Sequence, residues 1–204
     1  MFKFKIVLAG DKNVGKSSLL IRFCEGKFHE DLKETIGVDF KRKKVVINYD
    51  SKEVPLELSI WDFGGEDKYR SLFPAYANGA AAAFILFDTT NKKSLYGLEN
   101  WVKIIADNAF KNVVWIFIAT KIDLKDQREV SKKEALTFFE KYRWGKEIFK
   151  TSAKTGENVE KAFIHTARKL IDLNLQNCTG CGDFFSKKLN YCTICGEKIE
   201  KKQL

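Results

Sequence analysis

The stretch Gly10-Asp-Lys-Asn-Val-Gly-Lys-Ser17 matches the pattern Gly-x-x-x-x-Gly-Lys-[Ser/Thr] of loops that bind nucleotide phosphates. The segment before it, residues 2–9, changes from alternating to fully apolar, which is typical of a strand that enters a buried sheet. The segment after it, residues 17–24, reads as a helix. A loop between a strand and a helix turns successive N–H groups toward one point, and the helix dipole favours an anion there. The order of these segments therefore predicts a phosphate-binding loop in an α/β domain.

Individual residues of this loop suit different parts of a bound nucleotide. Gly10 and Gly15 let the backbone approach phosphate without a Cβ clash, and Asn13 tolerates left-handed geometry. Lys16 is expected to reach the β- and γ-phosphates, and Ser17 to offer its hydroxyl to Mg²⁺. An ordinary glycine-rich turn between a strand and a helix is the alternative. The candidate nucleotide-binding residues of the loop are Gly10, Asp11, Lys12, Asn13, Val14, Gly15, Lys16, Ser17 and Ser18.

Length and composition limit the class of protein. The chain has 204 residues, enough for one domain of ordinary size and a small appendage, and 45% of them are hydrophobic. No apolar run approaches the ~18 uncharged residues that a membrane span needs. Lys3 and Lys5 interrupt the apolar N-terminal segment, which argues against a secretory signal. We therefore expect a cytoplasmic protein.

The chain is basic, with a formal net charge of +9. Its densest basic cluster is Lys41-Arg-Lys-Lys44, which we interpret as the solvated edge of a strand rather than a nucleic-acid groove. Nonspecific attraction to anionic lipid or nucleic acid stays open as the alternative.

Two further loops carry residues that suit a nucleotide and its metal ion. Thr35 lies in the polar segment 27–37, where a threonine can give its hydroxyl to Mg²⁺ and its N–H to a phosphate oxygen. Asp62 ends a strand-like run and can hold Mg²⁺, and Gly65 can give its N–H to the γ-phosphate while that phosphate is present. Taken singly, these residues also fit a strand start and an acid–glycine turn.

The rest of the pattern predicts strands that alternate with helices. Two strand-like runs flank the polar segment 48–52 and indicate a hairpin. Continuous apolar runs predict buried strands, and apolar residues at helical spacing predict helices between them. The expected strands are Val38–Asn48, Val54–Trp61, Ala80–Phe87, Val113–Ala119 and Glu147–Lys150, and the expected helices are Ser94–Phe110, Ser131–Tyr142 and Glu157–Leu173.

Two loops follow the later strands, and the first of them can recognise a base. Thr120-Lys-Ile-Asp123 follows a strand whose C-terminal end should share a sheet edge with the phosphate loop, where open α/β sheets bind ligands. Asp123 can accept hydrogen bonds from the N1–H and the exocyclic amine of guanine, whereas adenine has no donor pair there. Thr151-Ser-Ala-Lys154 forms another loop at this edge. Among these loop residues, Asp123 is the candidate for base recognition.

The end of the chain carries a cysteine pattern typical of a metal site. Four of the five cysteines form two Cys-x-x-Cys-Gly pairs. Without a secretory signal, this spacing favours metal over disulfides, and four thiolates make a closed tetrahedral site that suits structural Zn²⁺. Redox disulfides or an iron centre are the alternatives. We expect residues 176–204 to form a zinc-ribbon tail with the ligands Cys178, Cys181, Cys192 and Cys195.

Taken in order, the motifs of residues 2 to about 175 resemble those of small GTPases of the Ras superfamily. Thr35-Ile-Gly-Val-Asp-Phe40 is similar to the first switch of Rab proteins, and Trp61-Asp-Phe-Gly-Gly65 leans toward the Arf pattern of the second switch. Thr120-Lys-Ile-Asp123 stands for Asn-Lys-x-Asp, with the threonine that Rho proteins have, and Ser152-Ala-Lys154 matches the guanine-contacting loop. The base-binding residues that the resemblance implies are Thr120, Lys121, Asp123, Ser152, Ala153 and Lys154.

The resemblance implies a P-loop NTPase G domain at residues 1–175, with a doubly wound, mostly parallel six-stranded sheet and helices on both faces. It implies a monomeric switch that binds GTP or GDP with Mg²⁺, hydrolyses GTP slowly, and signals to effector and regulatory proteins. It places Phe28 edge-on against the base, and Phe40, Trp61 and Tyr76 in a patch that effectors contact. Outside the phosphate and base loops, the candidate nucleotide-binding residues are Phe28, Thr35, Asp62 and Gly65; the candidate catalytic residues are Lys16, Thr35, Gly65 and Glu66; and the candidate Mg²⁺ ligands are Ser17, Thr35 and Asp62.

Two features depart from the family pattern. Glu66 stands where the family keeps a glutamine that orients the attacking water. The sequence ends Lys-Lys-Gln-Leu204 without cysteines for prenylation, so we expect no lipid anchor and at most peripheral contact with membranes. Two alternatives stay open: a hydrolysis-deficient scaffold that docks partners through its ribbon, and a GTPase that acts on nucleic acid. We rank the second of these last, because the ribbon is not strongly basic.

Overall fold

Strand β1 (Phe2–Ala9) lies in the middle of a six-stranded sheet and is paired in parallel with β3 and β4. The structure is a computed structural model, and it describes residues 1–144 and 147–198. The strand order is β2-β3-β1-β4-β5-β6, in which β2 runs antiparallel to β3 and the other pairs are parallel. The C-terminal ends of the parallel strands therefore meet at one edge of the sheet, where the loops of the candidate site lie.

The elements alternate along the chain as a doubly wound α/β fold requires. The strands are β1, β2 (Val38–Tyr49), β3 (Lys52–Phe63), β4 (Ala82–Asp88), β5 (Val114–Thr120), β6 (Ile148–Lys150), β7 (Leu175–Asn177) and β8 (Phe184–Ser186). The α-helices are α1 (Lys16–Glu25), α2 (Phe73–Ala77), α3 (Lys92–Tyr96), α4 (Leu98–Ala106), α5 (Lys132–Tyr142) and α6 (Val159–Asn174), and short 3₁₀ helices cover Asp67–Leu72 and Lys125–Gln127.

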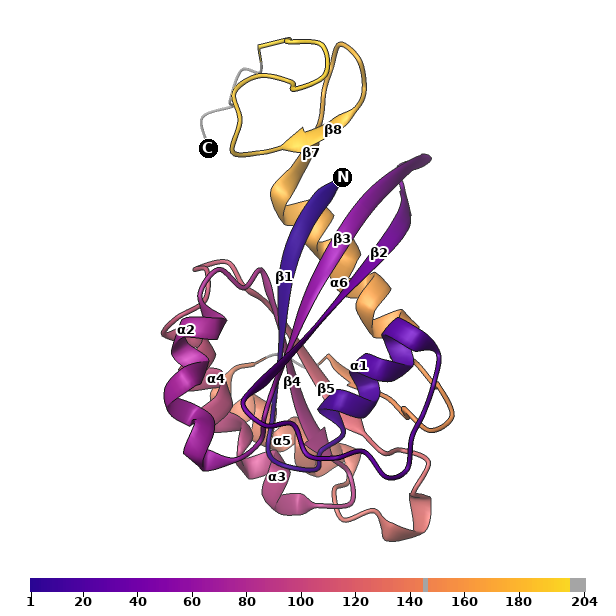
Figure 1. Ribbon diagram of the computed structural model, residues 1–204, viewed down its shortest axis with the longest axis vertical. Helices are drawn as coiled ribbons and strands as arrows, with labels where there is room; N and C mark the ends of the chain where they lie inside the picture. The colour runs from indigo at the N-terminus through magenta and orange to yellow at the C-terminus, as the bar shows by residue number, and fades with distance from the viewer. Residues whose placement is uncertain (145–146, 199–204) are drawn as a thin grey trace.

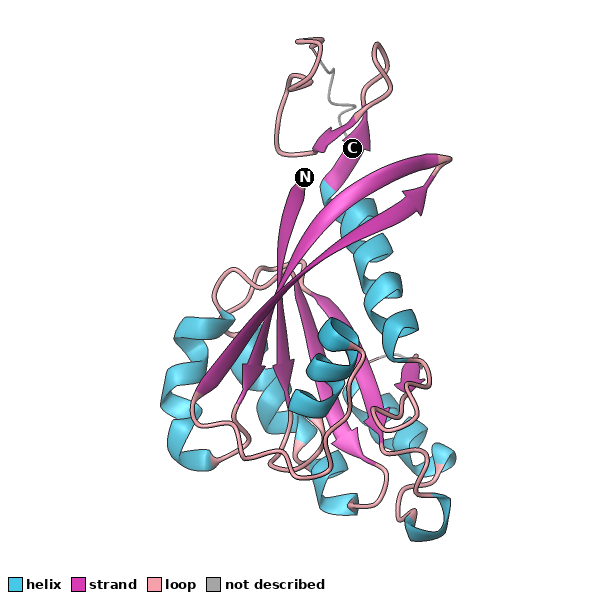
Figure 2. Cartoon of the chain, turned by 45° about the vertical axis from the view of Figure 1, so that its right-hand side comes forward, coloured by secondary structure: helices cyan, strands magenta, loops and turns pink. Residues whose placement is uncertain are grey.

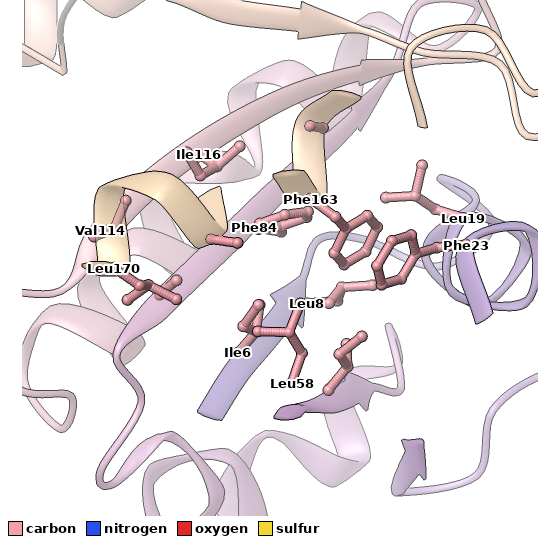
Figure 3. Packing of buried hydrophobic residues seen from close by; sticks show 14 of the residues in the cluster. Ile6, Leu8, Leu19, Phe23, Leu58, Phe84, Val114, Ile116, Phe163 and Leu170 are labelled. Carbon is pink, nitrogen blue, oxygen red and sulfur yellow. The ribbon is translucent and has the colours of Figure 1, made fainter. Parts of the chain in front are cut away.

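The sheet separates two hydrophobic cores because side chains alternate along each strand. Ile6 and Leu8 of β1 face α1 and α6, where Phe23 and Phe163 stack with ring centroids 3.8 Å apart (Figure 3). Val7 and its same-face neighbours pack instead with α2, α4 and α5. Helices therefore cover both faces of the sheet (Figure 1). The predicted fold class is confirmed.

One predicted helix is wrong. The periodicity of residues 94–110 predicts a single helix, but the structure has α3 and α4, which are separated at Gly97, and α4 ends at Ala106. The break lies against the phosphate loop: a Cβ on Gly97 would be 2.4 Å from Asp11 Oδ2. Helix α2 was not predicted, because five residues are too few to show a helical period.

The cysteine-rich tail continues directly from α6 and packs on the far end of the β2–β3 hairpin. Strands β7 and β8 pair antiparallel, and Phe184 of β8 contacts Tyr49 edge-to-face at 5.7 Å between ring centroids. Lys52 donates a hydrogen bond to the Gly182 carbonyl. Figure 2 shows the hairpin reaching beyond the rest of the sheet toward β7 and β8.

Within residues 1–144 and 147–198, no helix combines the length and the apolar character needed to cross a bilayer.

Candidate nucleotide-binding site and metal centre

The phosphate loop has the backbone geometry that its sequence predicts. Gly10 has φ +153°, and a Cβ there would be 2.4 Å from the Leu86 carbonyl oxygen, so only glycine fits. Asn13 has φ 62° and Gly15 has φ 94°, both left-handed. These angles turn the loop back onto the start of α1, as expected for an anion-binding helix N-terminus.

Lys16 lies in the floor of this loop with 5% of its surface exposed. Its Nζ donates hydrogen bonds to the carbonyls of Gly10 and Asp11, each 2.8 Å long. Burial lowers the pKa of Lys16 to about 8, while the nearby carboxylates of Asp62 and Asp11 oppose this shift. A phosphate beside the ammonium would favour its charged form further, so the lysine is placed to bind an anion.

Three predicted Mg²⁺ ligands from different segments meet next to Lys16. The Ser17 hydroxyl lies 2.7 Å from the Thr35 hydroxyl and donates a hydrogen bond to Asp62 Oδ2, which is 3.2 Å from the Thr35 oxygen. Asp62 is fully buried, its Oδ1 has no hydrogen-bond partner among the described residues, and burial raises its pKa. A divalent cation would satisfy this carboxylate. The all-oxygen donor set is the one that Mg²⁺ prefers, so these residues fit the ion.

A cavity of about 530 Å³ opens above these groups. Of the predicted site residues, it is lined by Lys12, Asn13, Gly15, Lys16, Ser17, Ser18, Phe28, Thr35, Gly65, Glu66, Thr120, Lys121, Asp123, Ala153 and Lys154. The sequence analysis missed eight other lining residues: Leu19, His29, Glu30, Leu32, Lys33, Glu34, Leu124 and Thr151. Most of these residues lie in the segment after α1. Its polar sequence has no periodicity from which one could predict which side chains face the cavity. The cavity thus collects loops that are far apart in the sequence.

Five predicted binding residues support the cavity rather than line it: Gly10, Asp11, Val14, Asp62 and Ser152. Asp11 Oδ1 accepts a hydrogen bond of 2.8 Å from the indole of Trp101, which turns the carboxylate away from the cavity. The Val14 carbonyl accepts from the Thr120 hydroxyl at 2.6 Å, and the Ser152 hydroxyl accepts from the Thr155 N–H at 3.1 Å. Their direct contact with a nucleotide stays a prediction.

The predicted base loops lie at the other end of the cavity. Lys121 is left-handed, with φ 56°, and its Nζ pairs with Asp88 at 2.7 Å, while Asp123 lines the cavity. Arg22 of α1 holds the neighbouring loop: its Nε donates to the Ala153 carbonyl at 2.6 Å and an Nη donates to the Lys154 carbonyl at 2.7 Å. The sequence has no signal for this arginine, because its partners lie more than a hundred residues away.

The two loops that follow the phosphate loop are linked through their backbones. The Gly64 N–H donates to the Gly37 carbonyl at 2.8 Å. Gly65 lies so close to the phosphate loop that a Cβ there would be 2.2 Å from the Lys12 nitrogen. The segment carrying Thr35 and the segment carrying Gly65 are therefore both closed over the cavity.

The predicted aromatic patch is also assembled. The rings of Phe40 and Trp61 are 4.8 Å apart, and those of Trp61 and Tyr76 are 5.5 Å apart. Phe40 and Trp61 are paired residues of the β2–β3 ladder, and Tyr76 comes from α2. Tyr76 is 37% exposed, so the patch reaches the surface.

The four cysteines of the tail form a second site. Their sulfur atoms all lie within 4.8 Å of one another, with Cys178 and Cys195 3.5 Å apart and Cys181 and Cys192 3.6 Å apart. Four thiolates at the usual Zn–S distance of ~2.3 Å would have sulfurs ~3.8 Å apart. The fifth cysteine, Cys24, lies in α1 outside this cluster. The cluster is compatible with one tetrahedral Zn²⁺.

A glycine-turned loop before α1, with a buried lysine and converging oxygen ligands at the sheet edge, defines a P-loop nucleotide-binding domain. Comparison with known proteins gives the family: the model of the Ras family matches residues 5–172. The Ras-related protein Rab-8B of Homo sapiens is 36% identical over 186 residues, which cover 89% of this chain and 87% of Rab-8B. Rab-4A of Bos taurus is 40% identical over 175 residues (84% and 76%), and Rab-13 of Canis lupus familiaris is 35% identical over 168 residues (82% and 80%). The chain therefore belongs to the Ras family, and it is a small GTPase, an enzyme that hydrolyses GTP.

Proposed function

We propose that the protein is a Mg²⁺-dependent molecular switch that is selective for guanine nucleotides and signals to effector proteins in its GTP state. The observation that carries this proposal is the meeting of Ser17, Thr35 and Asp62. Ser17 lies at the start of α1, directly after the phosphate loop, whereas Thr35 precedes β2 and Asp62 lies near the end of β3. A cation and phosphate held at this point would close both flanking loops, and loss of the γ-phosphate would release them.

Nucleotide binding divides among residues with different roles. Lys16 and the backbone of the phosphate loop would hold the β- and γ-phosphates, while Mg²⁺, when bound, would neutralise part of the phosphate charge. Asp123 would accept the two guanine donors, and Phe28 would cover an edge of the base. The Thr120 hydroxyl supports the base end of the cavity. It donates to the Val14 carbonyl of the phosphate loop at 2.6 Å and to the Phe87 carbonyl of β4 at 3.0 Å.

We infer that hydrolysis is slow without a partner, because of Glu66. A carboxylate can accept a hydrogen bond from the attacking water but, unlike an amide, cannot donate one toward the transferring phosphoryl group. It also brings negative charge close to three phosphates. Glu66 as a general base is the competing reading; the loose transition state of phosphoryl transfer needs little proton removal, which argues against it.

A scaffold that stays in the GTP state is the second candidate, and one contact favours it. Glu66 Oε1 lies 3.6 Å from Lys12 Nζ. This ion pair holds the carboxylate toward the lysine, so the carboxylate would contribute less to orienting the attacking water, and hydrolysis would be slower. Single-turnover hydrolysis of bound GTP separates the two functions. A rate near the ~10⁻⁴ per second of unassisted relatives supports the switch, and no measurable turnover supports the scaffold.

Effector proteins would bind at the aromatic patch beside the two closing loops. The patch of Phe40, Trp61 and Tyr76 lies beside both loops that contact the cation site, so its shape would depend on the nucleotide. Capture of protein partners by the GTP-analogue form compared with the GDP form tests this, and equal capture by the two forms would argue against it. We further propose a role in regulatory signalling of the vesicle-traffic kind, which the similarity to Rab-8B, Rab-13 and Rab-4A supports.

The tail, residues 176–204, would be a zinc-ribbon module joined to a G domain of residues 1–175. Support comes from the sulfur–sulfur distances of 3.5 and 3.6 Å, which approach those of a ZnS₄ tetrahedron. A site closed by four thiolates leaves no position for catalysis, so the metal would be structural. Reduced thiols of this kind fit the cytoplasm, where we place the protein. Metal analysis of the purified, reduced protein tests the assignment.

A further inference from the structure

A lysine of the phosphate loop joins both closed loops across the mouth of the cavity. Lys12 Nζ lies 2.8 Å from Glu34 Oε2 and 3.6 Å from Glu66 Oε1. Glu34 directly precedes the cation ligand Thr35, and Glu66 directly follows Gly65. All five residues line the cavity. One ammonium therefore bridges the two segments whose positions define the closed site.

The backbone beneath this bridge leaves little freedom. Gly65 is packed against the Lys12 nitrogen and Cα so tightly that a Cβ would be 2.2 and 2.4 Å from them. The hydrogen bond to Glu34, followed by the charges of Glu34 and Glu66, raises the pKa of Lys12, so the lysine is charged when both loops are closed. Opening either loop would separate one of the two ion pairs.

We propose that Lys12 is a positioning residue that holds both switch segments closed over the γ-phosphate of GTP by pairing with Glu34 and Glu66. The inference rests on the proposed function. It also explains how a carboxylate at position 66 is kept beside a triphosphate, because the lysine offsets its charge there. In the GDP state the loops have no γ-phosphate to close on, so the same pairs stabilise bound GDP much less.

The magnitude is limited by exposure. Lys12 and Glu34 side chains are 46% and 49% exposed and Glu66 is 25% exposed. Ion pairs of this kind each change an equilibrium by a factor of about 2 to 5, and two pairs on one ammonium by up to roughly tenfold. The effect is measurable and should weaken as salt is added.

The experiment measures dissociation rates of fluorescent GDP and of a fluorescent non-hydrolysable GTP analogue. Its variants are Lys12→Ala, Glu34→Gln and the double variant, all in the full chain. We expect Lys12→Ala to speed loss of the analogue by up to about tenfold and Glu34→Gln by about 2- to 5-fold, and each change to speed loss of GDP by less than about twofold. The double variant should match Lys12→Ala, because that change already removes the pair with Glu34. Lys12→Arg should retain most of the wild-type rate.

Two controls make the outcome decisive. Lys169, 41% exposed and 3.3 Å from Glu147, is a comparable ion-paired lysine on α6, and Lys169→Ala should leave both rates unchanged. The exchanged pair Lys12→Glu with Glu34→Lys keeps a pair between positions 12 and 34 but turns the pair with Glu66 into a repulsion, so it should still lose the analogue faster than the wild type. Additive effects of the single changes would mean that Lys12 acts on phosphate alone, and equal effects on GDP would mean that it shapes the loop; either result overturns the proposal. If the wild type binds neither guanine nucleotide, the proposed function itself fails.

Discussion

A methyl group on Gly65 should prevent the closed GTP state while sparing GDP binding. In the closed structure, a Cβ on this residue would lie 2.2 Å from the Lys12 nitrogen, 2.4 Å from its Cα and 2.5 Å from the Asp11 carbonyl carbon. Ordinary contacts to carbon are ~3.5–4.0 Å, so Gly65→Ala requires a backbone shift of more than 1 Å or so. The neighbouring backbone cannot give way, because Asp11 is held by Trp101 and Lys16.

Overpacking against fixed backbone costs about 1–3 kcal/mol, and this cost applies only when the loop is closed. The ratio of GTP-analogue affinity to GDP affinity should therefore fall by roughly 5- to 150-fold, as measured by equilibrium titration of both nucleotides. Gly26→Ala is the matched control: a Cβ there meets no atom within 4 Å, but φ is +70°. That variant should lower the melting temperature and keep the affinity ratio. If Gly65→Ala keeps the wild-type ratio within twofold, the closed geometry is not the GTP state.

Three further expectations follow from the site. Asp123→Asn should shift preference from guanine toward xanthine nucleotides, because the C2 carbonyl of xanthine needs a hydrogen-bond donor. Competition binding measures this preference. Equal wild-type affinity for ATP and GTP would contradict the role of Asp123. Glu66→Gln should raise single-turnover hydrolysis and weaken binding of the GTP analogue by no more than the factor of about 2 to 5 expected for its pair with Lys12. A tenfold fall in the hydrolysis rate, about 1.4 kcal/mol of barrier, would identify Glu66 as a working base. The purified protein should hold one zinc per chain; Cys192→Ser should abolish that zinc and disorder the tail while leaving GDP bound, and Cys24→Ser should retain the metal.

The fold could be predicted because its signals are local. The apolar alternation of β1 and the glycines of the phosphate loop act within a few residues, so pattern and conformation coincide. The failures have a different cause. The break at Gly97 lies where Asp11 approaches the chain, and the Trp101 indole donates a hydrogen bond to the same aspartate. No window of sequence contains both partners of such contacts.

The candidate site also has a part that could be predicted from the sequence and a part that could not. Ser17, Thr35 and Asp62 could be predicted from chemistry and resemblance, because each follows a recognisable motif. The bridge from Lys12 to Glu34 and Glu66 could not, because charged loop residues pair according to how the loops close.

Burial separates the fixed part of the site from the part that can move. The phosphate loop is held from behind by the indole of Trp101, which is fully buried, and by the hydroxyl of Thr120, which is 3% exposed. Such buried hydrogen bonds are costly to break, because their partners would be left without water. The closing loops are held instead by the exposed ion pairs of Lys12 and by the cation ligands. The strength of these contacts depends on which nucleotide and ion occupy the site. We therefore expect a nucleotide-dependent rearrangement to be confined to the segments around Thr35 and Gly65, and the phosphate loop to keep its shape in both states.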